Sequence, residues 1–318
     1  MMNQFYRYSN ETKRWFYPFI LIFKILKFIL KELRFDVYLL SGKTKMFYIT
    51  SSTINPYFIE KICENATIEK IKKIYVWELR RFIIQQDKVL IDMHKLFAHF
   101  FYDDFLVPPY VRQILDLNKP IRKNSEYKKI SKYRCEFLTD LNALKFFYEK
   151  MYFPYIKKRY GDSAVIQSFN YFEKSFLKNG ELIFIKLNDE YVSAVLCEMS
   201  KNVYFFKKVG VLNESLVKEG AISATYYFSI LRAKEKNAKY IDFGLSRPFL
   251  LDGVLRYKRK WGTQICEDKK IDRIFYMKNT FKQPFICIEN KKLTAVVFSK
   301  NDNFIKEYAM SGLEFKIA

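Results

Sequence analysis

The stretch YIDFGLSRPFLLDGVLRYKRKWG, residues 240–262, carries the features on which the fold assignment depends. Its apolar start, YIDFG, predicts a strand that follows a helix rich in Ala, Tyr and Leu over 220–236. Such a strand is expected to pair parallel with a strand that precedes the helix. The Asp-Gly pair at 252–253 predicts a turn, and a short helix at about 253–260 follows it. That helix carries four cations, namely Arg256, Lys258, Arg259 and Lys260.

Upstream of this stretch, three apolar runs predict a meander of strands. The runs ELIFIKL (181–187), YVSAVLCEM (191–199) and VYFFKKVGV (203–211) are separated by short polar turns. Two helical patterns precede them, over 139–153 and 164–180. The resulting order of elements predicts an α/β (α+β) fold, with a mixed sheet and helices packed on both of its faces.

The same stretch resembles a known signature. An Asp-Phe-Gly at a strand end (242–244), then Gly253, an aromatic-Lys pair (257–258) and Trp-Gly (261–262) resemble the C-terminal motif of Fem-like transferases, a branch of the GNAT acyltransferase superfamily. The run FYEKMYFPYIKKRYGDSA, residues 147–164, is similar to the segment that these proteins place before the sheet. The resemblance covers about 130–280 and implies two tandem GNAT-like lobes.

The polar and basic run LNKPIRKNSEYKKISK, residues 117–132, predicts the main domain boundary. Before it, FLVPPYVRQILDL (105–117) predicts a turn followed by a short helix, because Pro109 stands near a helix start. We therefore expect a basic amphipathic N-terminal helix at 1–34, a degenerate GNAT-like lobe at 35–130, a GNAT-like transferase lobe at 131–280 and a C-terminal β extension at 281–318.

The chain is strongly basic. Its 318 residues include 56 Lys and Arg against 34 Asp and Glu, a formal net charge of +22. Such a charge favours polyanionic partners such as tRNA, other nucleic acid, anionic lipid or phosphorylated substrates. The sequence is also rich in Lys, Ile, Asn, Phe and Tyr, as AT-rich genomes tend to encode, so composition offers a second explanation of the charge.

An apolar segment near the N-terminus, WFYPFILIFKILKFILKELR at 15–34, has a longest charge-free run that is too short to span a bilayer. Four cations fall on one helical stripe, which suits a helix lying in a membrane interface. The pattern suits equally a surface helix docked on the protein's own core. The four cations are Lys24, Lys27, Lys31 and Arg34.

Metal and disulfide chemistry have no support in the sequence. The five cysteines are scattered without a CxxC pair, and His94 and His99 point to different sides of a helix. We expect no metal, a reducing cytoplasmic location and a possible peripheral contact with the inner face of the membrane. The cysteines are Cys63, Cys135, Cys197, Cys266 and Cys287.

The resemblance implies transfer of an acyl or aminoacyl group from an activated donor to an amine, with no permanently bound cofactor, by a monomer or dimer. The donor is either aminoacyl-tRNA or acyl-CoA. In VLNESLVKEGAISATYY (211–227) only Gly220-Ala221 matches the end of the usual GNAT pyrophosphate loop, so we favour an RNA-borne donor. The alternative is a catalytically inactive GNAT-like module that binds RNA or an anionic membrane through its basic face.

Three residues are candidates for catalysis. By the resemblance, Lys258 stabilises the oxyanion or binds donor phosphate. Asp242, at a strand end, is a candidate to orient the amine or take its proton, although an Asp there often caps a turn. Asp252 is a second candidate base, and its alternative role is again in a turn.

The candidate substrate-binding residues fall into two groups. Arg247 precedes Pro248 in the loop, where a guanidinium suits phosphate or carboxylate, and Tyr257 and Gly220 belong to the motif regions described above. In the upstream segment, Arg159 and two tyrosines are candidates for an acceptor wall, and core packing is the alternative role for the tyrosines. These are Tyr152 and Tyr155.

Overall fold

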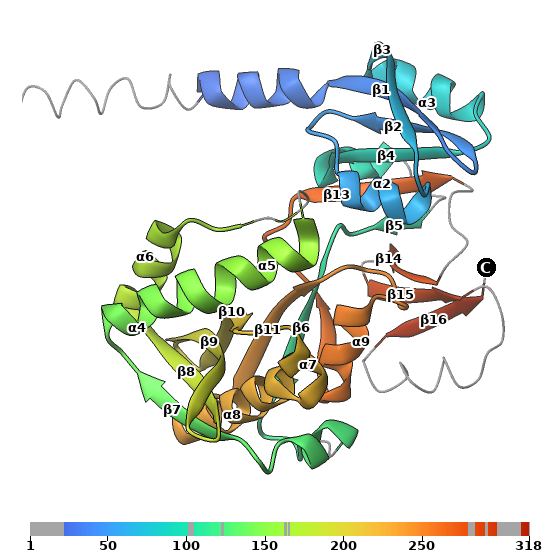
Figure 1. The fold of residues 1–318 in the computed structure, drawn as a ribbon. Coiled ribbons are helices and arrows are strands. Elements are labelled where there is room, and N and C mark those ends of the chain that lie inside the picture. Colours follow the sequence, from blue (N-terminus) through green and yellow to red (C-terminus); the bar gives the residue numbers. More distant parts are fainter. Residues whose placement is uncertain are drawn as a thin grey trace, which may run out of the picture. The chain divides into compact units, whose positions relative to one another are not determined.

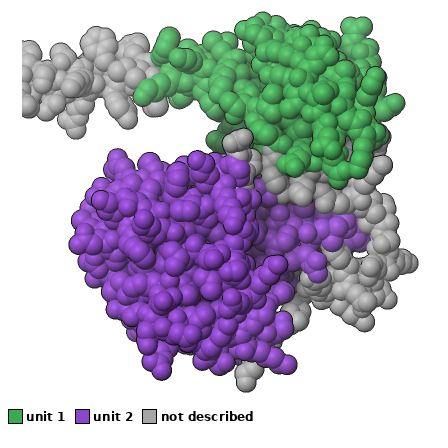
Figure 2. Space-filling model, viewed as in Figure 1, with its two compact units in different colours: residues 1–107, 272–282 green, residues 108–271, 283–318 purple. Residues whose placement is uncertain are grey.

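The computed structural model has a mixed α/β fold, as the sequence predicts. It describes residues 22–100, 105–121, 124–161, 164, 166–278, 284–289, 292–297 and 313–317. The chain forms two compact units, shown in different colours in Figure 2. Unit 1 is 1–107 with 272–282, and unit 2 is 108–271 with 283–318. Each unit contains a mixed sheet.

In unit 1 the strands follow the order β5-β13-β4-β2-β1-β3. Neighbours β2 and β4 pair parallel, and the other pairs are antiparallel. Between the strands lie two α-helices and a 3-10 helix. The elements are β1 Arg34–Ser41, β2 Lys45–Thr50, α2 Pro56–Ile62, β3 Thr67–Tyr75, α3 Val76–Ile84, β4 Val89–His94, η1 Lys95–Phe100, β5 Phe105–Val107 and β13 Arg273–Lys278.

In unit 2 the strand order is β12-β6-β11-β10-β9-β8-β7. The predicted meander is β8-β9-β10, and β11 pairs parallel with β10, as expected for a strand after a crossover helix. Figure 1 shows these strands with helix α8 beside them. The strands are β6 Val111–Asp116, β7 Arg134–Leu138, β8 Gly180–Leu187, β9 Glu190–Ser200, β10 Val203–Val211, β11 Tyr240–Ser246 and β12 Gln264–Glu267.

The helix expected after Pro109 is wrong, because residues 111–116 form strand β6. Val111, Gln113 and Leu115 are buried while the residues between them are partly exposed, which is the two-residue period of a strand. The strand pairs antiparallel with both β11 and β12. Tertiary pairing on two sides has therefore overridden the local helix signal.

Helices pack on both faces of the unit 2 sheet, as expected. Along β8, Leu182 and Phe184 belong to one core cluster, whereas Ile183 and Ile185 belong to the other. The first face carries the helical run that begins at N-cap Asp140 and ends at Gly161, together with α6. The helices of that face are α4 Leu141–Phe146, the π-helix η3 Phe147–Tyr152, α5 Phe153–Tyr160 and α6 Phe169–Asn179.

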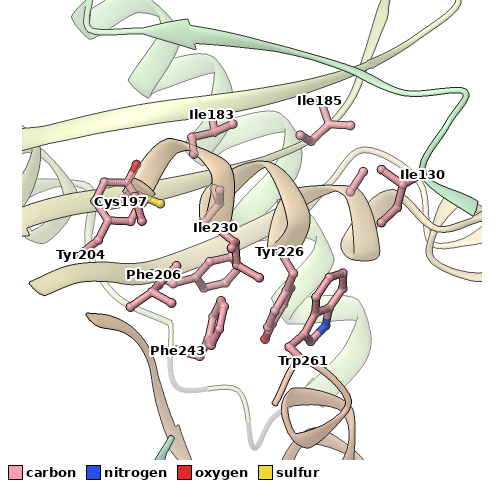
Figure 3. Packing of buried hydrophobic residues seen from close by; sticks show 14 of the residues in the cluster. Ile130, Ile183, Ile185, Cys197, Tyr204, Phe206, Tyr226, Ile230, Phe243 and Trp261 are labelled. Carbon is pink, nitrogen blue, oxygen red and sulfur yellow. The ribbon is translucent and has the colours of Figure 1, made fainter. Parts of the chain in front are cut away.

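The other face of the sheet is covered by α8, Ala221–Glu235, which follows the short helix α7, Ser215–Glu219. Figure 3 shows this cluster of buried residues from close by. Tyr226 of α8 stacks on Phe243 of β11 at 4.7 Å between ring centroids and on Trp261 at 5.7 Å. Phe243 and Trp261 of the 240–262 stretch are thus core residues that pack α8 against the sheet.

The C-terminal strands of unit 2 pack against the loop and helix that follow β11. Helix α9, Gly253–Lys260, contributes Leu255 to a buried cluster with Ile286 and Ala295. The backbones of Pro248 and Ile286 are hydrogen bonded at 2.7 Å. The strands are β14 Phe285–Glu289, β15 Lys292–Val297 and β16 Glu314–Ile317.

None of the helices in the described part of the chain has the length and apolar character needed to cross a membrane. Of the N-terminal segment singled out in the sequence, residues 22–32 form a helix, and 15–21 lie outside the described residues.

Candidate active site

Helix α9 has a buried face that contains a lysine. Asp252 caps the helix: its Oδ1 accepts hydrogen bonds from the backbone N–H groups of Val254 and Leu255, both at 2.9 Å. The cap fixes where the helix starts, and therefore which side chains turn inward. Leu255, Lys258 and Arg259 are spaced three and four residues apart, so they share one face, and all three are buried.

Lys258 is only 5% exposed. Its Nζ donates a hydrogen bond of 2.8 Å to the backbone carbonyl of Leu245 in β11. Burial lowers the pKa of Lys258 to about 7, although the carboxylates of Asp242 and Asp252 oppose this shift. Arg112, a nearby like charge, adds to the lowering. The amine is therefore close to half-protonated near neutral pH.

Asp242 is buried, and both of its carboxylate oxygens accept hydrogen bonds. Oδ2 accepts one from Arg112 at 2.5 Å, and Oδ1 accepts one from the backbone N–H of Gly244 at 2.7 Å. The second contact is a turn cap, the alternative role that the sequence offered for Asp242. The structure therefore favours a positioning role for Asp242, and its role as a base stays a prediction.

Arg112 of β6 links two buried carboxylates. Its Nη1 bonds Asp242 and its Nη2 bonds Asp268, each at 2.5 Å. Burial alone would raise the pKa of Asp268, but hydrogen bonds from the Lys270 backbone N–H and from Arg112 outweigh it and lower the pKa. Both carboxylates thus pair with one guanidinium, and Asp242 and Arg112 are among the charges that act on Lys258.

The sheet changes its pairing beside this cluster. Strands β10 and β11 pair over only three residues each, and the pairing ends at Phe205 and Asp242. On the other side of β11, the register with β6 shifts between Asp242 and Leu245. Gly244 lies within that irregular stretch at φ +75°, a conformation that favours glycine. The backbone that carries the Leu245 carbonyl therefore departs from a regular strand next to Lys258.

The loop between β11 and α9 places the other candidate cation. Arg247 lies 3.7 Å from Asp252 as an ion pair. Phe249 forms an isolated antiparallel β-bridge with Phe285, which holds this loop against β14. The structure thus brings four predicted residues into one neighbourhood through a chain of contacts, with Lys258 at its centre: Lys258, Asp242, Asp252 and Arg247.

Tyr257 of α9 faces the first turn of α8, and Gly220 is the N-cap residue of α8. The Tyr257 hydroxyl is 2.9 Å from that of Ser223, which donates to Glu126 at 2.7 Å. Lys260 pairs with the same carboxylate at 3.0 Å. Gly220 joins α7 to α8 at φ +108°, and a side chain there would meet Lys129. Their contribution to substrate binding stays a prediction.

The upstream candidates have other neighbours. Tyr152 belongs to the core cluster of α4 and α6, and Tyr155 to that of α8; both are buried. Arg159, which is exposed, donates a hydrogen bond to the Tyr155 hydroxyl. The structure favours core packing for the two tyrosines and leaves an acceptor wall there untested.

Sequence reasoning missed the polar residues contributed by β6, by the turn after α9 and by the residue that follows β12. Gln113, fully buried, donates to Ser246 and accepts from Thr263, both at 2.8 Å. Arg112 and Asp268 complete the site as described above. The sequence did contain a signal for strand β6, because apolar and polar residues alternate around Arg112. The prolines before this run favoured a helix start instead.

Comparisons with known proteins give similarity at the level of structure alone. No family profile and no curated protein matches the chain. The crystal structure of FemX is similar with a TM-score of 0.42 and 15% identity, over 75% of this chain and 83% of that one. L-PGS from Bacillus licheniformis gives 0.39 and 10%, over 64% and 73%. A GCN5-related N-acetyltransferase from Kribbella flavida gives 0.33 and 10%, over 73% and 80%. The expected similarity to Fem-like and GNAT proteins is therefore found, at low identity.

Proposed function

We propose that the chain is an N-acyltransferase in which Lys258 transfers the proton. The observation that carries the proposal is the buried lysine of α9, whose pKa is lowered to about 7 beside two carboxylates and a guanidinium. A general acid or base works best when its pKa lies near the working pH. An amine with the reference lysine pKa, above 10, is almost entirely protonated at neutral pH and so can rarely accept a proton there.

The proposed reaction needs one proton to move twice. The acceptor amine attacks the donor carbonyl, a new C–N bond forms, and neutral Lys258 takes the proton that the amine loses. The bond to the leaving oxygen or sulfur then breaks, and protonated Lys258 returns that proton to the leaving atom. An ammonium has three N–H donors, and the described contacts of Lys258 use one of them, at Leu245. The others can donate to the oxyanion.

We propose an aminoacyl-tRNA donor ahead of acyl-CoA. In an acyl-CoA enzyme the diphosphate would favour the free N-terminus of a helix such as α8. Here the carboxylate of Glu126, which accepts from Ser223 and pairs with Lys129 and Lys260, already occupies the first turn of α8. The net charge of +22 is in turn suited to RNA. The acceptor is a primary amine.

The test is a transfer assay with two labelled donors, a mixture of aminoacyl-tRNAs and acetyl-CoA, and lysine as acceptor. Lys258→Ala is expected to lower the rate about 10²–10⁴-fold, the usual cost of removing a general acid or base. Lys178→Ala, which changes an exposed lysine at the end of α6, is the matched control and keeps the wild-type rate.

Three results would test the role of Lys258 and the transferase activity. With wild-type protein, the rate should rise with pH through about 7, and Lys258→Arg, which does not titrate there, should lack that rise. Wild-type transfer that survives Lys258→Ala would overturn the mechanism. RNA binding without transfer from either donor would instead support the inactive binding module.

A further inference from the structure

The helix formed by residues 22–32 exposes apolar side chains that the described part of unit 1 does not cover. Phe23 and Leu30 are 68% and 67% exposed, and every residue from 22 to 31 is exposed. In Figure 1 this helix is the unlabelled blue coil that leads into β1. Burial against the protein's own core, one of the two expectations from the sequence, is therefore not what the structure shows.

Apolar and basic residues lie on different sides of this helix. Lys24, Lys27 and Lys31 recur every three or four residues and so form one stripe. Opposite to them lie Ile22, Ile25, Leu26, Ile29 and Leu30, with the spacing of a single apolar face.

The C-terminal end of the helix is fixed to unit 1, so its exposure is not that of a frayed terminus. Glu32 is buried and accepts hydrogen bonds from Ser51 at 2.5 Å and from Arg273 at 2.9 Å. Phe28 packs edge-on against His94, with 5.1 Å between the ring centroids. The helix thus has one anchored end and an open apolar face.

Aromatic residues of the interfacial type lie next to the anchored end. The backbone N–H of Val76 donates to the carbonyl of Leu33 at 2.9 Å, so the junction of β3 and α3 adjoins the helix end. On either side of Val76, the rings of Tyr75 and Trp77 stack at 4.7 Å, and Trp77 is 68% exposed. Tyr and Trp are the residues that concentrate at the headgroup level of membranes.

We propose that residues 22–32 bind the surface of an anionic membrane, with the helix lying in the interface. The apolar face enters the acyl boundary, and the lysine stripe contacts anionic headgroups. A second copy of the chain fits less well, because two helices paired through their apolar faces would leave both lysine stripes on the outer sides, without an anionic partner. The proposal does not depend on the activity proposed above.

The test is co-sedimentation of the full chain with vesicles of phosphatidylcholine mixed with phosphatidylglycerol, and with phosphatidylcholine alone. Binding is expected to the mixed vesicles only, and to weaken with salt. Changing Lys24, Lys27 and Lys31 to Gln should weaken it about fivefold per lysine. The same change at three exposed lysines of unit 2, which also removes three charges, should weaken it much less: Lys174, Lys178 and Lys218.

A second pair of variants separates the apolar face from the net charge. Leu30→Asp and Leu177→Asp change side chains that are both 67% exposed, and they add the same charge. Only Leu30→Asp should reduce vesicle binding, by more than tenfold. Equal losses in the two variants, or a dimer in solution that Leu30→Asp dissolves while vesicles bind neither protein, would overturn the proposal.

Discussion

Two lysine-rich helices of this chain have opposite surroundings. In α9, Lys258 is buried, bonded to a carbonyl, and has its pKa lowered to about 7. In the helix of residues 22–32, Lys24, Lys27 and Lys31 are exposed. Both helices repeat cations at short spacing, so composition does not tell them apart. The difference arises from what each helix packs against, and it separates a candidate catalytic lysine from lysines suited to a charged surface.

The largest effect should come from Arg112, the shared partner of two buried carboxylates. Arg112→Ala leaves the buried carboxylates of Asp242 and Asp268 without their shared partner, and breaking such a buried pair costs about 3–5 kcal/mol. The free energy of unfolding, measured in urea, should fall by that amount. Lys119→Ala, at an exposed cation just after β6, should change it by less than about 0.5 kcal/mol. A similar loss of unfolding free energy in both variants would contradict a stabilising role for the pairs that Arg112 makes with Asp242 and Asp268.

The buried Lys258 and the exposed lysines should also differ in how they make the free energy of unfolding depend on pH. The folded-state pKa of Lys258, about 7, lies below its ordinary 10.5, so the unfolded chain binds more protons between those values. The free energy of unfolding should therefore rise with pH in this window, by about 2 kcal/mol from pH 7 to 9. Lys258→Met should remove this rise.

Lys24→Met is the control for the pH experiment, because it makes the same substitution at an exposed lysine. Its unfolding profile, measured in urea at the same pH values, should match that of the wild type. If the unfolding free energy of Lys258→Met rises with pH as in the wild type, the rise is not due to Lys258. The proposed difference between Lys258 and the exposed lysines would then be wrong.

The smallest of these effects concerns the start of α9. Asp252→Ala removes the cap that bonds Val254 and Leu255, at a cost of about 1 kcal/mol in unfolding free energy. Because the cap fixes the helix start, the variant should also alter the pH dependence that is due to Lys258. Asp140→Ala removes a similar cap from α4 and should lower stability without altering that pH dependence. Identical pH profiles for both variants would show that the Asp252 cap does not influence the pKa of Lys258.

Local sequence patterns predicted most of the unit 2 fold. The meander, the crossover helix and the parallel pairing of β11 follow from hydrophobic period and element order, and the similarity to Fem-like proteins was expected from residues 240–262. Strand β6 could not be predicted in the same way, because two prolines precede it and its partners, β11 and β12, are far away in the chain.

The candidate site was predictable only in part. The motif pointed to Lys258, but the lowered pKa depends on burial, which no local pattern of Tyr257 to Lys260 encodes. Asp242 and Asp252 were expected at the site, and their hydrogen bonds to Gly244 and Val254 follow from ordinary turn and cap chemistry. Arg112 was missed because its contact with Asp242 spans 130 residues.

That separation has a consequence for how the protein is made. Strand β6 leaves the ribosome more than a hundred residues before β11 and β12, the two strands that pair with it. At the usual rate of synthesis this interval is on the order of ten seconds. During that time both edges of β6 are unpaired, and an unpaired edge can join strands of other chains. We therefore expect the nascent chain to depend on chaperones until residue 267 has been synthesised.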